Sequence, residues 1–178
     1  MDIVGFVLLG TATGIGGGTI RDAVLGATPV FWVNSPGYLL ACVVMSVAVF
    51  FLAHVPQSRE DLLLRFDAVG LALFTVLGAD KALAIGAGPV PAVAMVLVTA
   101  TFGGIVRDVL SGEIPAILSR EIYATAALAG VMAFVLLNGT VVPRETAIVA
   151  GFVLTLAIRF GALRWSWSLP RYGQSSDV

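Results

Sequence analysis

Long apolar runs, separated by short segments rich in proline, glycine, asparagine or charge, dominate the pattern along this chain. Each run is apolar nearly all round rather than along one stripe, which is typical of helices that face lipid and one another. Strands of a transmembrane barrel would instead show short segments of alternating polarity. The pattern predicts an all-α membrane protein with six transmembrane helices, at residues 3–26, 37–55, 67–86, 90–111, 121–138 and 146–163.

Composition supports a membrane location and excludes several classes of function. Of the 178 residues, 58% are hydrophobic and 12% charged, and the mean hydropathy is +1.00. Soluble domains contain about 45–50% apolar and about 25% charged residues, so a small water-soluble enzyme is excluded. A net charge of −1 leaves no basic stripe for nucleic acid. The one cysteine, Cys42, excludes an internal disulfide and a cysteine-rich metal site.

Lysine and arginine in the short loops predict the orientation, because cytoplasmic loops of membrane proteins are enriched in both. One end of the predicted bundle carries only Lys81 and Arg144. The other end carries Arg59, Arg65, Arg120, Arg164 and Arg171. We therefore expect the C-terminus in the cytoplasm, and with six spans the N-terminus as well. Trp165 and Trp167, at the end of the last run, fit an aromatic belt at the membrane interface.

An internal repeat organises the chain. A shift of 86 residues places Gly17 to Asp22 on Gly103 to Asp108, and six of the thirteen positions 17–29 are identical to their counterparts. Because the copies lie three spans apart, their helices must run antiparallel, which is the inverted-repeat plan of many transport proteins. The predicted organisation is one transmembrane channel domain, 1–178, comprising a partial first repeat 1–56, a second repeat 66–138, a final helix 146–163 and a polar tail 169–178.

Glycines interrupt the apolar pattern at corresponding places in the two repeats. Gly16, Gly17 and Gly18 lie near the middle of the first predicted helix, and Gly103 and Gly104 near the middle of the fourth. Each glycine costs about 1 kcal/mol of helix propensity relative to alanine. In return it permits a bend, or lets another helix come very close. We predict kinked helices at both places.

Each glycine cluster is followed by an Arg-Asp pair, Arg21-Asp22 and Arg107-Asp108. Charges within a bilayer are costly and usually functional. Adjacent residues on a helix point about 100° apart, so we expect each of these charges to find a partner elsewhere, or water. One interpretation is a polar pathway whose carbonyl oxygens coordinate a desolvated cation. The alternative is that the glycines are packing notches and the charges are buried knots that hold the bundle together.

Three further groups of charges are less informative. Asp80-Lys81 is either a vestibule group or a snorkelling pair at a helix end. Asp2 and Asp67 are explained by placement at helix N-termini. Arg159 lies inside the last run, and we expect it to snorkel toward the inner membrane face.

At these motifs the chain resembles the prokaryotic branch of the trimeric intracellular cation (TRIC) channel family, also classed as a glycine-transporter-type (UPF-type) membrane domain. The resemblance extends to Phe31-Trp32, Lys81-Ala82-Leu83, Arg120-Glu121-Ile122-Tyr123 and Trp165-Ser166-Trp167-Ser168-Leu169-Pro170. It implies a non-enzymatic homotrimer in a prokaryotic inner membrane, with a monovalent-cation pore in every protomer. It also implies seven helices, of which the first has no counterpart here before Met1.

The expected function is passive conduction of potassium, with K⁺ or Na⁺ and membrane lipid as the expected small partners and no cofactor. The expected pathway residues are Gly16, Gly17, Gly18, Arg21, Asp22, Asp80, Lys81, Gly103, Gly104, Arg107 and Asp108. A secondary transporter of a small amino acid such as glycine is the main alternative, in which Arg21 or Arg107 would hold the substrate carboxylate. A third alternative is a non-conducting membrane scaffold.

Overall fold

The computed structural model describes residues 2–52, 59–115, 117, 122–165 and 167, and these residues contain no strand. The six predicted helices are confirmed as the long helices of the fold. They are α1 (Ile3–Val24), α3 (Gly37–Leu52), α4 (Arg59–Ala84), α5 (Pro89–Ser111), α6 (Ala124–Asn138) and α7 (Arg144–Trp165). A short helix, α2 (Phe31–Asn34), was not predicted and lies between Pro29 and Pro36. Arg120, Arg171 and the polar tail 169–178 lie outside the described residues.

α4 differs most from its predicted bounds, because it begins at Arg59 rather than at residue 67. The extra residues include Arg59, Glu60 and Asp61, which hydropathy assigns to a loop. Charged residues such as arginine and glutamate are nevertheless good helix formers, so the helix extends beyond the apolar run. As a result, Asp67 lies within α4 rather than at its start.

The inverted repeat is visible in how α1 and α5 begin and end. They begin at Ile3 and Pro89, which are related by the same 86-residue shift as the motifs. Gly26 and Gly112 follow their last turns with φ of 66° and 75°. The next amide in each copy donates to a carbonyl five residues back, that of Asp22 or Asp108, at 2.8 Å. Glycine suits both ends because other residues enter the left-handed region at a cost.

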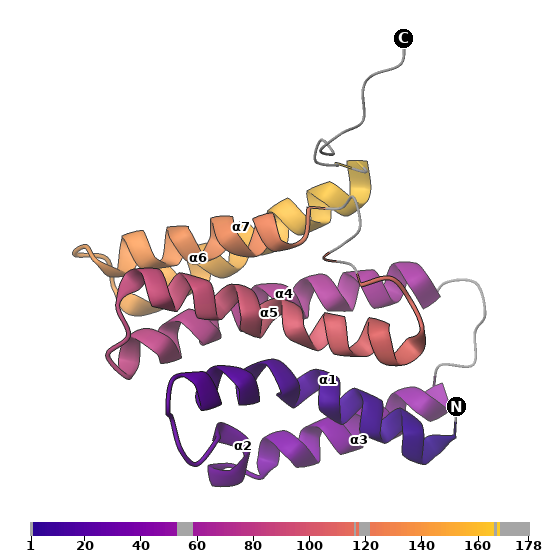
Figure 1. The fold of residues 1–178 in the computed structure, drawn as a ribbon. Helices are drawn as coiled ribbons and strands as arrows, with labels where there is room; N and C mark the ends of the chain where they lie inside the picture. The colour runs from indigo at the N-terminus through magenta and orange to yellow at the C-terminus, as the bar shows by residue number, and fades with distance from the viewer. Residues whose placement is uncertain (1, 53–58, 116, 118–121, 166, 168–178) are drawn as a thin grey trace, which may run out of the picture.

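The helices lie side by side in three layers with similar axis directions (Figure 1). α1 and α3 pack together on one side, α4 and α5 form the middle layer, and α6 and α7 form the other side. α5 contacts α1, and α4 contacts α7, so the middle layer joins the other two. α1 runs away from the end where the N-terminus lies, whereas α5 runs toward that end (Figure 1). The two motif helices are therefore antiparallel, as the repeat predicts.

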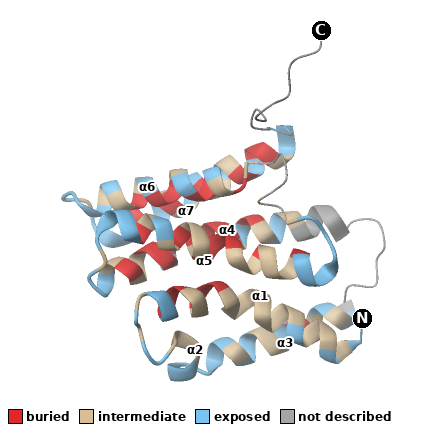
Figure 2. Ribbon diagram, viewed as in Figure 1, coloured by how far each residue is buried: buried red, intermediate tan, exposed pale blue. Residues whose placement is uncertain are grey.

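Buried residues are concentrated between the layers (Figure 2). Many of the exposed residues are large and apolar. Much of the buried core is small: Ala68, Ala72, Ala79, Ala82, Ala92, Ala126 and Ala127 are all fully buried. By contrast, Leu8, Leu40 and Leu136 are about two-thirds exposed. α1, α5 and α7 are long and apolar enough to cross a membrane, and α3 and α6 are apolar but shorter. Such an exterior is expected for a protein surrounded by lipid.

Candidate functional site

The glycine motifs meet where α1 crosses α5. A Cβ atom added to Gly17 would overlap the backbone carbonyl oxygen of Thr99, and one added to Gly103 would lie 2.6 Å from the carbonyl oxygen of Thr13. Thr13 and Thr99 are themselves related by the 86-residue shift. The contact is therefore reciprocal, as a pseudo-two-fold axis requires. Both helices continue without a break through their glycines. The role of Gly17 and Gly103 is therefore to let the two backbones touch.

The neighbouring glycines make room for aromatic side chains. A Cβ atom on Gly18 would lie 2.6 Å from the Phe31 ring, and one on Gly104 would lie 2.9 Å from the Tyr123 hydroxyl oxygen. Gly16 is less confined, with the Phe102 ring at an ordinary 3.7 Å. The second glycine of each copy thus admits a ring from the segment that precedes the next long helix.

A first charge cluster lies at the C-terminal end of α1. Arg21 donates through Nε and Nη2 to Oδ1 of Asp22, at 2.9 and 2.7 Å. Oδ2 of Asp22 accepts from Lys81 Nζ at 2.6 Å and from the Phe31 backbone amide at 2.9 Å. Asp22 is fully buried. The expected partner elsewhere is found for Asp22, which binds Lys81. Arg21 and Asp22 also pair with each other, because the long arginine side chain spans the angle between adjacent positions.

The second charge cluster lies at the C-terminal end of α5 and repeats this plan with a different third member. Arg107 donates through Nε to Asp108 and through Nη1 to Asp67, both at 2.8 Å. The Tyr123 hydroxyl donates to the same Asp67 oxygen at a longer 3.4 Å. Asp67 therefore holds Arg107, and its interpretation as a helix-start residue is wrong. The sequence does contain a signal for this role of Asp67. A carboxylate in an apolar run needs a partner of opposite charge, and the same run also carries Lys81.

Arg159 joins the second cluster from α7. Its side chain is fully buried, with Cζ 4.9 Å from the centre of the Tyr123 ring. Nη1 also donates to the carbonyl of Ile122 at 3.4 Å. The expected snorkelling to the membrane surface is therefore wrong. The Tyr123 ring, through a cation–π contact, and the Ile122 carbonyl hold this guanidinium inside the protein.

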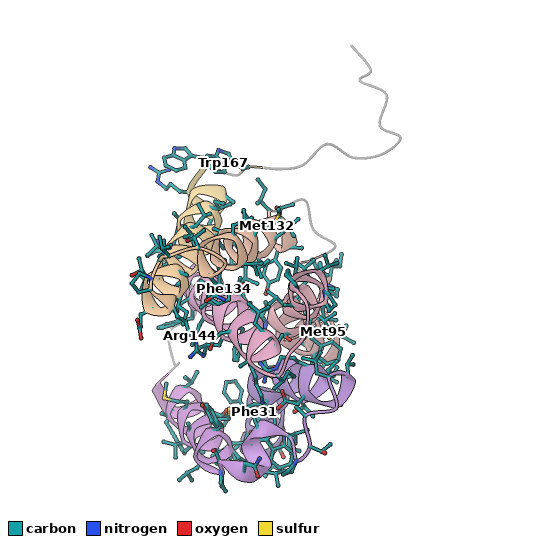
Figure 3. All side chains as sticks on the ribbon, turned by 90° about the vertical axis from the view of Figure 1, so that its left-hand side faces the viewer. Phe31, Met95, Met132, Phe134, Arg144 and Trp167 are labelled. Atoms are coloured by element: carbon teal, nitrogen blue, oxygen red, sulfur yellow. The ribbon has the colours of Figure 1, made fainter. Side chains whose placement is uncertain are left out.

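Asp80 and Lys81 separate, although they are neighbours in sequence. Lys81 turns to Asp22, as described above, whereas Asp80 accepts two hydrogen bonds from Arg144, both at 2.6 Å. The Arg144 side chain is 60% exposed, so this pair lies at the molecular surface. Figure 3 looks along the helices from the end that carries Arg144 and Phe31. Of the two residues, only Lys81 belongs to the first cluster.

α4 connects the two charge clusters. Asp67 lies in its first half and Lys81 near its end, fourteen residues apart, which corresponds to about 21 Å of helix. α4 adds a third charge to each Arg-Asp pair, and the two added charges differ in sign. Lys81 brings a positive charge to Asp22, and Asp67 brings a negative charge to Arg107. Within the described residues, no three histidine, cysteine or acidic side chains are grouped as a metal site would need. The site is therefore one of ion pairs around a close helix crossing.

Comparison with known proteins gives consistent similarities over nearly the whole chain. The family model described as "Glycine transporter" matches residues 1–54 and 64–139. The UPF0126 inner membrane protein YadS of Escherichia coli (strain K12) is 45% identical over 174 residues, which cover 97% of this chain and 84% of that protein.

Two solved structures share the fold. The TRIC trimeric intracellular cation channel orthologue from Rhodobacter sphaeroides superimposes with a TM-score of 0.90 at 60% identity, covering 94% of this chain and 86% of that chain. A second structure, described in terms of conductance through TRIC cation channels, has a TM-score of 0.87 at 34% identity and covers 99% of this chain and 87% of that chain.

Proposed function

Since this chain belongs to the family described as "Glycine transporter", and its fold is that of the TRIC cation channels, we propose that it is a channel for monovalent cations, potassium above all, in a prokaryotic inner membrane. The observation that carries the proposal is the reciprocal α1–α5 crossing with an ion-pair cluster at each end. A cation route along this crossing, inside a single protomer, would have polar groups at both of its ends.

Unpartnered oxygen atoms on α1 and in the second cluster support a cation as the permeating species. The hydroxyls of Thr11 and Thr13 and Oδ2 of Asp67 are buried, and none has a hydrogen-bond partner in the part of the chain that the structure describes. Buried acceptors without a donor are costly, and a passing cation or its water would satisfy them. The arginines contribute no acceptor, so we assign them to anchoring the carboxylates rather than to binding the ion.

In this conformation the first cluster is closed. The Lys81 ammonium lies 2.6 Å from Asp22, where a permeating cation would otherwise approach that carboxylate, and the Arg21 side chain is only 7% exposed. We infer that conduction requires Lys81 to leave Asp22. Because Lys81 is itself one-third exposed, it can move toward solvent without breaking the helix packing.

The test is single-channel recording of the purified protein in planar bilayers with potassium salts on both sides. We expect unitary current steps, and a reversal potential set by the cation gradient. Asp22→Asn removes the carboxylate that binds Lys81 and is expected to change the opening probability. Glu145→Gln removes an exposed carboxylate outside both clusters and is the matched control. Absence of steps in all variants, with the folded protein present in the bilayer, contradicts a channel.

A carrier for a small amino acid is the second candidate, favoured by the description of the family model. Both motif arginines already hold carboxylates of this chain, which shows the chemistry that a substrate carboxylate would need. Saturable uptake of radiolabelled glycine without unitary steps would establish the carrier. Unitary steps without glycine uptake would exclude it.

We propose, in addition, that the protein assembles as a homotrimer, because the related structure from Rhodobacter sphaeroides is described as trimeric. Large apolar side chains on the outer face of α3, among them Leu40, Val44 and Met45, would pack against either lipid or another copy. Chemical cross-linking in native membranes is expected to give a trimer as its largest specific product.

A further inference from the structure

A cavity of about 430 Å³ lies between the first turns of α4 and the last turns of α7. The described residues that line it are Leu64 and Arg65 from α4 and Phe160, Leu163 and Arg164 from α7. No residue of the two charge clusters lines it. The cavity lies at the end of the molecule opposite the Asp80–Arg144 pair, where α4 begins and α7 ends (Figure 1).

Two arginines, Arg65 and Arg164, line this cavity, and none of its described lining residues is acidic. Arg65 and Arg164 are both exposed, and neither makes an ion pair with a carboxylate of the described residues. By contrast, Arg21, Arg107 and Arg144 each bind an aspartate. Two like charges in one cavity favour an anion, and guanidinium groups bind phosphate with paired, charge-assisted hydrogen bonds.

The depth of the cavity in the membrane follows from two tryptophans at the end of α7, the helix that supplies Arg164. The rings of Trp165 and Trp167 stack with centres 5.6 Å apart, and Trp167 packs over Gly161 of α7. Figure 3 shows Trp167 beyond the end of α7, at the margin of the bundle. Tryptophans concentrate where lipid headgroups meet the hydrocarbon region. Arg164 is adjacent to Trp165 and therefore lies at headgroup level.

We propose that this cavity binds the phosphate of an anionic phospholipid such as phosphatidylglycerol. Arg65 and Arg164 hold the phosphate, and an acyl chain lies against Leu64, Phe160 and Leu163. Basic pockets between transmembrane helices are known to bind anionic headgroups. A soluble phosphate would also bind the two arginines. Only a lipid has an acyl chain that can pack against the apolar side of the cavity. Bound there, the lipid links α7 to α4, which contributes one residue to each charge cluster.

The test is native mass spectrometry of the purified full chain titrated with phosphatidylglycerol or with phosphatidylethanolamine of the same acyl chains. We expect preferential binding of phosphatidylglycerol. Each arginine at an anionic surface contributes about fivefold in affinity, so Arg65→Gln with Arg164→Gln is expected to weaken binding about 30-fold. Arg144→Gln removes one positive charge at the opposite end of α7 and is the matched control, with unchanged binding.

Each contrary result has a definite meaning. Equal phosphatidylglycerol affinity in the double variant and in Arg144→Gln overturns the proposal. Competition by glycerol 3-phosphate at concentrations as low as those of the lipid overturns the lipid as ligand and identifies a soluble phosphate. If the double variant does not fold, Arg164→Gln alone is measured, and an affinity loss below about twofold overturns the proposal. All readouts are binding affinities, so none depends on whether the protein conducts ions.

Discussion

At the scale of single residues, the glycines of this chain differ in what surrounds their absent side chains. Gly17 has a backbone oxygen in the space that a methyl group would need, whereas Gly70 of α4 has no atom within 4 Å of that position. A backbone atom cannot turn aside as a flexible side chain does. Gly17 is therefore required for the close contact of two helices, whereas Gly70 makes no contact that a methyl group would disturb.

Gly17→Ala is expected to lower the free energy of unfolding by about 1–3 kcal/mol, because α1 and α5 must move apart. Gly70→Ala adds helix propensity without a clash, and it is expected to raise the same quantity by up to about 1 kcal/mol. Unfolding of the detergent-solubilised protein, followed by circular dichroism, measures both. Equal effects of the two substitutions would contradict the role of Gly17 in the crossing.

The Asp67–Arg107 pair supports a second prediction at this scale. Asp67→Asn and Arg107→Gln are each expected to lower the unfolding free energy by about 1–3 kcal/mol, because each leaves a largely buried charge with fewer partners. The double variant is expected to lose about 1–2 kcal/mol less than the sum of the two. The same cycle for Asp80 and Arg144 is the control. It should show a smaller coupling, since solvent screens an exposed pair.

The positions of the charges were predictable from the sequence, but their partners were not. Arg21 and Asp22 stand out in a chain with only 12% charged residues. Which oxygen meets which nitrogen depends on side-chain direction and on neighbouring helices. Arg159 illustrates this limit, because its place in an apolar run is equally compatible with snorkelling and with burial against Tyr123.

At the scale of helices, glycines with positive φ end α1 and α5 in the same way. Gly26→Ala and Gly112→Ala are each expected to lower the unfolding free energy by about 1 kcal/mol, because alanine enters the left-handed region at a cost. Gly37→Ala, at a position with negative φ and free space around it, is expected to have little effect. Circular dichroism melts of the three variants test this, and unequal losses at Gly26 and Gly112 would contradict equivalent helix ends.

Hydropathy located the long helices well because lipid requires apolar runs of that length. It placed the start of α4 too late, since propensity continues the helix through charged residues. It also missed α2, whose four residues, Phe31 to Asn34, are too few to show a helical period. Helix boundaries at the membrane surface thus follow local propensity rather than hydrophobicity.

At the scale of the whole molecule, the length of α7 indicates that its two ends lie on opposite sides of the membrane. Its 22 residues correspond to about 33 Å, enough to cross a hydrocarbon core of about 30 Å. Arg144 at its start and Trp167 just after its end should therefore face different compartments. The antiparallel arrangement of the repeats was predictable from the number of spans between them. The two motif helices lie three membrane crossings apart, and an odd number of crossings reverses the direction of the chain.

Cysteine labelling tests the orientation. In a Cys42→Ala background, Arg144→Cys is expected to react with a membrane-impermeant maleimide added to spheroplasts, because the short Lys81 and Arg144 loops predict the outer face. Trp167→Cys is expected to react only after the membrane is opened. Labelling of Trp167→Cys alone in intact spheroplasts would reverse the assigned orientation, and labelling of both would contradict a membrane-crossing α7.

The reciprocal contact of Gly17 with Thr99 and of Gly103 with Thr13 has a consequence for the origin of this chain. It is the contact that two identical shorter polypeptides would form if they inserted in opposite directions and dimerised about a two-fold axis. Joining them into one gene leaves that contact intact and removes the requirement that both halves stay the same. The third partners, Lys81 at one end and Asp67 at the other, both come from α4 and are not related by the 86-residue shift.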